Sequence, residues 1–339
     1  MKRKVQQLGS STLAVTVPAE WARQHEIEKG DEVIVQRDEN GGSLLLVPEE
    51  PTLEDTDAVV DVDELDADDL ERAIVSQYVL GRQLVRVTAS DPLTRGHRDA
   101  IARAERRLMG LGVVEQADTH ATVRCSVAPS DFDLPTLLGR ISRTEATMRS
   151  DAVRAVVDAD ADRARAVVSR YEQVEKLFYL FLRLVFATYR NPRLNRAVGL
   201  DTGFPLIGFR SVAQDLVLMA DVAREIATLV SEGDAVAPDE ATAASLTDLE
   251  ATLAEAVEAT FDAVTTPTHD ATATARDCLD RVTGRADDLN DHLAADRPEP
   301  LLVLQRTVVL LERSARHARD SLSVATHLAF RADTELVER

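Results

Sequence analysis

The residues of this chain with the clearest chemical potential are the basic side chains near its beginning. Residues 1–25 contain four basic residues and one acid, a local charge of +3; the net charge of the whole chain is −20, so the remaining residues carry −23. The basic residues are Lys2, Arg3, Lys4 and Arg23, and the acid is Glu20. A phosphate backbone would be repelled by most of such a surface and attracted by its first residues. The charge distribution therefore predicts a nucleic-acid contact at the N-terminus.

Arginine supplies nearly all of the positive charge, because only four of the 39 basic residues are lysines. An acidic surface with so few lysines is typical of proteins from salt-loving archaea, in which carboxylates keep the surface hydrated and molar salt screens their repulsion. An ordinary acidic protein is the alternative. Cys125 and Cys278 have no metal-ligand spacing, and no apolar run reaches the ~18 residues of a membrane span. We therefore expect a reduced, cytoplasmic protein with no membrane span.

Residues 1–48 show a pattern of short strands around one short helix. The predicted strands are 5–8, 13–17, 32–36 and 44–47. Pro18 begins a predicted helix that continues to His25, and Asn40-Gly41-Gly42 forms a hairpin turn between the last two strands. So small a β-rich unit buries little core alone, which favours two interlocking copies.

Four motifs stand out in this segment. They are Arg3-Lys4-Val5, Leu8-Gly9-Ser10-Ser11, Val15-Thr16-Val17-Pro18-Ala19-Glu20-Trp21 and Ile27-Glu28-Lys29-Gly30-Asp31-Glu32-Val33. Together they make the segment similar to the AbrB/MazE/SpoVT family of swapped-hairpin DNA-binding domains. The resemblance implies a homodimer on double-stranded DNA. It assigns the contacts to Arg3, Lys4 and Arg23, with Gln6, Ser10, Ser11 and Thr12 as polar helpers. An ordinary solvated strand edge is the alternative interpretation.

The middle of the chain changes composition twice. Residues 49–66 are rich in Asp and Glu and have little apolar periodicity, which predicts an acidic linker. Residues 67–132 fit a small α/β module. Its predicted elements are helices 67–80 and 94–109 and strands 83–89, 112–116 and 121–127. The second helix carries Arg95, Arg98, Arg103, Arg106 and Arg107. We expect a solvated helix face paired with acids, and a second anion-binding patch is the alternative.

From residue 133 onward, strand signals are absent and apolar residues recur at helical spacing, as in Leu177, Leu180, Phe181 and Leu184. The predicted helices are 134–158, 162–190, 205–232, 240–266, 269–295 and 298–331. Pro and Gly residues separate them by short turns, which is typical of an antiparallel all-α bundle.

An internal repeat divides this half into 133–234 and 235–333. Ala220–Glu225 aligns with Ala315–Asp320, and Glu172–Leu177 aligns with Asp277–Val282. Each repeat then contains three helices, an acidic pair three residues apart on the second helix, and an acid on the third. The acids are Glu172, Glu175 and Asp221 in the first repeat and Asp277, Asp280 and Glu312 in the second.

This arrangement, with Leu311-Glu312-Arg313-Ser314-Ala315 leading into His317-Ala318, resembles the PhoU family of phosphate-signalling proteins. The resemblance implies control of phosphate uptake, and it makes the six acids above candidate ligands for a divalent or iron-type metal. The motifs are incomplete, because Val217 and Arg316 stand where acids are expected; Arg316 could instead form an ion pair with Glu312. Structural or surface acids, and a helix-packing role for His317, are the alternatives.

The two resemblances together imply a DNA-binding transcriptional regulator of phosphate uptake and phosphate homeostasis, whose bundle acts as a sensor or partner-binding domain. One alternative is a PhoU-type signalling adaptor for a phosphate transporter, in which the N-terminal domain mainly dimerises. An antitoxin-like protein is another, although the long bundle argues against it. An enzyme is least favoured, because no nucleophile–base constellation, phosphate-binding glycine loop or HExxH motif occurs.

Overall fold

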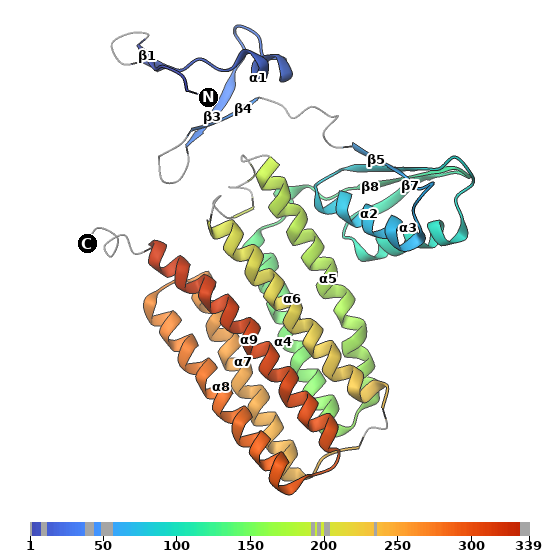
Figure 1. The fold of residues 1–339 in the computed structure, drawn as a ribbon, viewed down its shortest axis with the longest axis vertical. Helices are drawn as coiled ribbons and strands as arrows, with labels where there is room; N and C mark the ends of the chain where they lie inside the picture. The colour runs from blue at the N-terminus through green and yellow to red at the C-terminus, as the bar shows by residue number, and fades with distance from the viewer. Residues whose placement is uncertain are drawn as a thin grey trace. The chain divides into compact units, whose positions relative to one another are not determined.

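The computed structural model describes residues 2–7, 12–37, 44–48, 57–190, 194, 198–199, 204–233 and 236–332. The chain separates into two compact units, Met1–Thr56 and Asp57–Arg339. The first unit is small and β-rich, and the second combines a small α/β module with an all-α bundle (Figure 1). The multidomain fold class predicted from the sequence is confirmed.

The N-terminal unit consists of two antiparallel strand pairs and one short helix. β1 (Gln6–Gln7) pairs with β2 (Leu13–Ala14), α1 (Ala19–Gln24) follows, and β3 (Val33–Arg37) pairs with β4 (Leu44–Pro48). The order of elements is the predicted one, although the first two strands are shorter than expected.

Apolar side chains of this unit remain in solvent. Leu13 is 70% exposed, Val15 is 60% exposed, and α1 has no buried residue. Such a unit gains little stability from its own core, because the hydrophobic effect scales with the apolar area removed from water. A second copy could bury this surface, and the dimer stays a prediction.

The α/β module opens the second unit. Its sheet has the order β5 (Asp57–Asp61), β6 (Leu84–Thr88), β8 (His120–Cys125), β7 (Leu111–Gln116). β5 runs parallel to β6, and the other neighbours are antiparallel. The helices α2 (Ala67–Val79) and α3 (Arg95–Arg107) lie together on one face of the sheet, where their apolar side chains share a core with those of the strands (Figure 1). Thr94 caps α3 by accepting a hydrogen bond from the His97 backbone N–H.

The prediction of a linker over 49–66 is wrong for residues 57–61, which form β5. Val60 points into the core and is only 8% exposed, whereas Val59 is exposed, as are Asp57 and Asp61. β5 lies at the edge of the sheet and buries one side chain, that of Val60, so the strand tolerates Asp57 and Asp61 at its two ends. This pattern is too short to show period-2 alternation. Residues 49–56 lie outside the described part of the chain.

The bundle is built from two successive groups of three antiparallel helices. The first group is α4 (Leu134–Asp158), α5 (Ala161–Arg190) and α6 (Phe204–Ser231), and the second is α7 (Glu240–Thr265), α8 (His269–Asp296) and α9 (Leu301–Ala332). Each predicted helix lies within three residues of the observed bounds. The groups are joined mainly where α6 packs along α9 and where α4 meets α7 (Figure 1). Among the described helices, none combines the length and apolar character needed to cross a membrane.

A buried ion cluster connects α4 to α7. The Arg149 guanidinium donates to Glu145 at 2.9 Å and to Glu250 at 2.7 Å, and the side chains of Arg149 and Glu145 are at most 2% exposed. Burial raises the pKa of Glu250, while Arg149 opposes that rise. One cation thus neutralises two carboxylates in a region of low dielectric constant, and without it both would be unpaired.

Replacing this cation tests how far the join between α4 and α7 depends on it. We expect Arg149→Met to lower the free energy of unfolding of the bundle by about 3–5 kcal/mol, because two buried carboxylates lose their partner. Denaturant unfolding followed by circular dichroism measures it. The control is Arg165→Met, which removes an exposed pair with Asp162 and should cost less than about 1 kcal/mol. Equal effects for the two variants would contradict the role of Arg149.

Candidate functional site

The predicted DNA contacts lie on the first strand pair and on α1. Arg3 and Lys4 precede β1, Gln6 lies on it, and Thr12 directly precedes β2. These four side chains are exposed. Arg23 is exposed on α1, where its Nε donates to the Ala19 carbonyl at 3.3 Å. Ser10 and Ser11 lie outside the described residues. Two basic and two polar side chains on or next to the short β1–β2 pair are therefore exposed to solvent.

The predicted metal ligands of the first repeat point to different partners. Glu172 is exposed on α5. Glu175 forms an ion pair with Arg107 of α3 at 2.7 Å. Asp221 on α6 pairs with Arg224 at 2.5 Å. Glu175 and Asp221 both act on the Arg224 guanidinium, but among the described residues the three acids form no group with metal-ligand spacing.

The predicted metal ligands of the second repeat also differ in their surroundings. Asp277 is exposed on α8, and Asp280 pairs with Arg319 of α9 at 3.1 Å. Glu312 is half-buried on α9. The expected ion pair between Glu312 and Arg316 is not among those formed by the described residues.

A different group of side chains meets where the two repeats join. Asp215 of α6 and His317 and Asp320 of α9 place one potential ligand atom each within 4.8 Å of the others. The Ser321 hydroxyl donates to Asp215 Oδ2 at 2.8 Å. Burial raises the pKa of Asp215 to about 6, and burial also lowers the pKa of His317. A neutral imidazole beside two carboxylates is a donor set that Zn²⁺, Mn²⁺ or Fe²⁺ accepts.

Sequence reasoning singled out His317 but missed Asp215 and Asp320. The spacing of His317 and Asp320 on one helix face was a usable signal. Asp215 lies about 100 residues away in sequence and becomes a neighbour only when α6 packs on α9.

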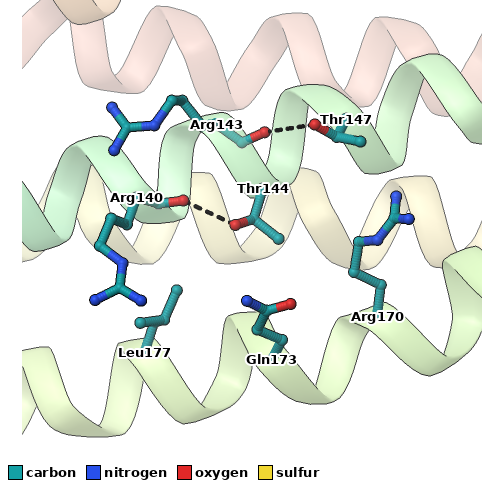
Figure 2. A pocket seen from close by; sticks show the side chains of 7 residues that line it. All are labelled: Arg140, Arg143, Thr144, Thr147, Arg170, Gln173 and Leu177. Atoms are coloured by element: carbon teal, nitrogen blue, oxygen red, sulfur yellow. Dashed lines mark hydrogen bonds between the residues drawn. The ribbon is translucent and has the colours of Figure 1, made fainter.

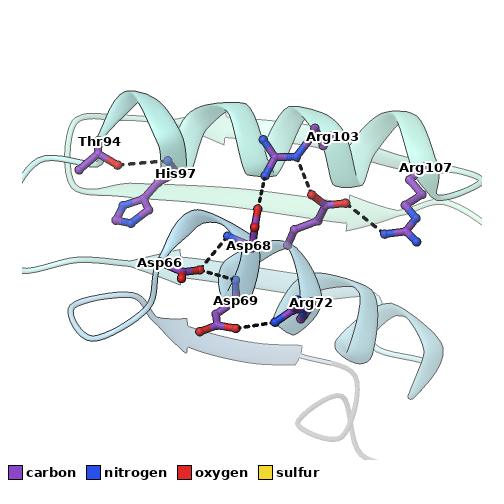
Figure 3. A network of polar contacts seen from close by, with 9 residues as sticks. Asp66, Asp68, Asp69, Arg72, Thr94, His97, Arg103 and Arg107 are labelled. Carbon is purple, nitrogen blue, oxygen red and sulfur yellow. Dashed lines mark hydrogen bonds and ion pairs between the residues drawn. The ribbon is translucent and has the colours of Figure 1, made fainter. Parts of the chain in front are cut away.

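The arginine row on α3 faces acids, as predicted. Arg103 pairs with Glu71 at 2.6 Å and with Asp68 at 3.3 Å, both on α2, and Arg107 pairs with Glu71 at 3.2 Å (Figure 3). Arg95 and Arg98 lie 3.7 Å from Asp99 and Asp118. These exposed or half-exposed pairs neutralise four of the five arginines of the row, and Arg106 is exposed without an ion pair to a described carboxylate.

Two arginines fasten the α/β module to α5. Arg107 donates to both Glu175 and the Tyr179 hydroxyl, at 2.7 Å and 3.0 Å. Arg183 is 3% exposed and donates to the carbonyls of Tyr78 and Arg82 at 2.6 Å and 2.8 Å. Its guanidinium also lies 4.9 Å from the centre of the Tyr78 ring. A buried cation that satisfies two carbonyls holds the end of α2 in a defined position on α5.

With this geometry in place, the chain can be compared with known proteins. Residues 6–54 match the family model described as antidote-toxin recognition MazE, bacterial antitoxin. Residues 138–230 match the PhoU domain model. Both resemblances drawn from the sequence are confirmed. The PhoU match falls on α4, α5 and α6, which form the first three-helix group.

A solved structure aligns with part of the chain. The crystal structure of PhoU from Pseudomonas aeruginosa aligns with a TM-score of 0.48 and 17% sequence identity, over 57% of this chain and 94% of that chain. A search of curated proteins found no match.

Among the described residues, the acids predicted as ligands for a divalent or iron-type metal do not form one converging set. A metal site of this kind needs several converging carboxylates, whereas Glu175, Asp221 and Asp280 each have a guanidinium partner. Arginine supplies the positive charge that a metal would supply elsewhere.

Arg183→Met tests the attachment of the α/β module. Methionine keeps the apolar stem and leaves the Tyr78 and Arg82 carbonyls without a donor, so we expect the attachment to weaken by about 2–3 kcal/mol. Amide hydrogen exchange at Gly81 and Arg82 should accelerate. Arg72→Met, which removes an exposed pair on α2, serves as the control and should leave exchange unchanged. Unchanged exchange in Arg183→Met would show that Arg183 does not hold the module.

Asp215→Asn tests the buried carboxylate between the repeats. The pKa of Asp215 is about 6 in the folded chain and 3.8 for an ordinary aspartate, so the folded chain binds this proton more tightly. The carboxyl group therefore lowers stability as pH rises from about 4 to about 6. Asparagine stays neutral and can accept the Ser321 hydrogen bond. Relative to the parent chain, we expect the variant to gain about 1–3 kcal/mol of unfolding free energy between pH 4 and pH 7, measured with EDTA present.

The exposed Asp277→Asn variant is the control, and its stability relative to the parent chain should change little with pH. If the Asp215→Asn difference were also independent of pH, the raised pKa would be refuted.

Proposed function

We propose that this protein is a DNA-binding transcriptional regulator of phosphate uptake and phosphate homeostasis. The observation that carries the proposal is the joining of a MazE-like unit to a PhoU-like bundle in one chain. Both matched families are regulatory, and the proposal assigns no catalytic step to the chain. In this proposal the N-terminal unit binds double-stranded DNA as a homodimer in the cytoplasm, and the bundle senses a ligand or a phosphate-signalling partner.

Charge supports DNA contact by the N-terminal unit, because Lys4 and Arg23 are exposed in a segment whose local charge is +3. Of the five arginines in the α3 row, four are instead paired with acids. Phosphate contacts made by exposed basic side chains release counterions, so their affinity falls as salt rises. In a salt-loving archaeon, which the composition favours as the source, the polar side chains of Gln6 and Thr12 would carry a larger share of the affinity.

A signalling adaptor and an antitoxin are the competing functions. The adaptor would bind phosphate-transport components and would not shift a promoter fragment in a gel. The antitoxin reading has the description of the matched MazE model in its favour. It requires a toxin partner bound near the N-terminal unit, whereas most of this chain is an ordered bundle and α/β module. Co-purification followed by mass spectrometry distinguishes these two functions, because the adaptor would retain phosphate-transport components and the antitoxin would retain a toxin.

The test replaces Arg3 and Arg23 with alanine, singly and together. With a promoter fragment from a phosphate-transport operon, we expect the double variant to bind about tenfold more weakly or worse, because two cationic contacts are lost. The slope of log K against log salt should fall by about one unit for each phosphate contact removed. Gel-shift titrations at several KCl concentrations measure both quantities.

Lys29→Ala is the matched control, because Lys29 is an exposed basic residue of the same unit that is not a predicted contact. It should bind DNA as the parent chain does, and circular dichroism should show an intact bundle in every variant. A double variant that still shifts the fragment with unchanged affinity would refute this mode of DNA binding.

A further inference from the structure

The first three-helix group contains a surface cleft that the predicted sites do not use. It lies between α4 and α5 and has a volume of about 330 Å³ (Figure 2). Three arginines line it, Arg140 and Arg143 from α4 and Arg170 from α5. Pockets that hold small ligands begin at about this size.

The two helices present their polar residues to the cleft by simple periodicity. On α4, Arg143, Thr144 and Thr147 follow Arg140 at intervals of three, four and seven residues. On α5, Gln173 follows Arg170 by three residues, and the buried Leu177 follows by seven. Such intervals place side chains on one face of a helix. Figure 2 shows Arg140 and Arg170 on opposite sides of Thr144 and Gln173.

The charge in this cleft is unusual for the chain. The protein has 59 acidic residues against 39 basic ones, and the arginines of α3 that face α2 are paired. No acid lines the cleft. Arg170 is held by Asp151 at 2.7 Å, but neither Arg140 nor Arg143 forms an ion pair with a carboxylate of the described residues. Two positive charges are therefore left in excess on a protein of net charge −20.

The available donors define the ligand. The hydroxyl groups of Thr144 and Thr147 donate to the helix carbonyls of Arg140 and Arg143 at 2.8 Å and 2.9 Å, so their protons are already used. The Arg140 and Arg170 guanidinium groups and the Gln173 amide are the donors that face the cleft, whereas the Arg143 guanidinium borders it and extends back along α4 toward Gly139 (Figure 2). Guanidinium groups fit pairs of phosphate oxygens. The ligand must accept hydrogen bonds and carry negative charge.

We propose that this cleft binds a phosphate-type oxyanion that carries more than one phosphate group. Its volume exceeds the space that a single orthophosphate fills, and its donors come from both helices, so a condensed phosphate spans them. The inference rests on the cleft alone and holds whether or not the N-terminal unit binds DNA.

Calorimetric titration of the full chain tests the proposal. The probes are orthophosphate, pyrophosphate and tripolyphosphate, each at constant ionic strength set with KCl, and sulfate serves as the reference anion. We expect pyrophosphate or tripolyphosphate to bind more tightly than orthophosphate and sulfate. In Arg140→Gln/Arg143→Gln, which keeps much of the side-chain volume, we expect the affinity to fall about tenfold or more, because two charged donors are removed.

The charge-matched control is Arg72→Gln/Arg95→Gln, which removes two exposed arginines of the α/β module that are paired with acids. It should bind the probes as the parent chain does. Thermal unfolding without ligand checks that both double variants remain folded.

Three results would overturn the proposal. One is the absence of binding by every phosphate probe. Another is binding of equal strength in the parent chain and in Arg140→Gln/Arg143→Gln. The third is competition between a DNA duplex and the phosphate probes, together with loss of DNA binding in Arg140→Gln/Arg143→Gln. That result would assign the cleft to nucleic acid.

Discussion

The structure depends on arginine neutralising carboxylates that the chain holds in excess. Many of these pairs lie where two elements meet, not only on isolated helix faces. Arg149 connects α4 to α7 through Glu250, and Arg313 connects α9 to α6 through Glu225 at 2.5 Å. Arg107 connects α3 to α5 through Glu175. The Arg149 pair is buried, and because an unpaired buried charge is costly it favours α4 and α7 as neighbours. The pairs of Arg313 and Arg107 are partly exposed and contribute less to stability.

Much of the fold could be predicted from the sequence because the helices are long and regularly patterned. Apolar residues at three- and four-residue spacing, separated by Pro and Gly, place all six bundle helices within a few residues of their observed ends. The sequence did not predict β5, because this strand buries a single valine and its apolar and polar residues do not alternate. The motifs at the N-terminus identified their unit from type and spacing alone, because they are local in sequence.

The site geometry was less predictable, for a physical reason. Asp215 meets His317, and Arg140 and Arg170 line one cleft, only through the register of one helix against another. That register is set by core packing over many residues, and no short sequence motif predicts it. The acids chosen from repeat alignment shared an equivalent position in each repeat, yet Glu175 and Asp280 were already paired with arginines from other elements. Local spacing shows which side chains share a helix face, and it does not show what that face contacts.

The helix α5 has a central position in the second unit. Arg170 and Gln173 line the cleft on one side, and Glu175, Tyr179 and Arg183 hold the α/β module on another. Fewer than four helical turns separate the first of these residues from the last. An anion bound in the cleft would therefore act on the same helix that positions the module, which gives the PhoU-like half a defined element through which a bound ligand could act.

The central claim is that one chain couples DNA binding to phosphate status. Genome-wide mapping of DNA bound by the protein in cells grown with high and with low phosphate tests it most directly. The account predicts enrichment at promoters of phosphate-uptake genes, with an occupancy that changes with phosphate supply. An absence of enriched sites, or sites unrelated to phosphate uptake whose occupancy is the same in both conditions, would contradict it.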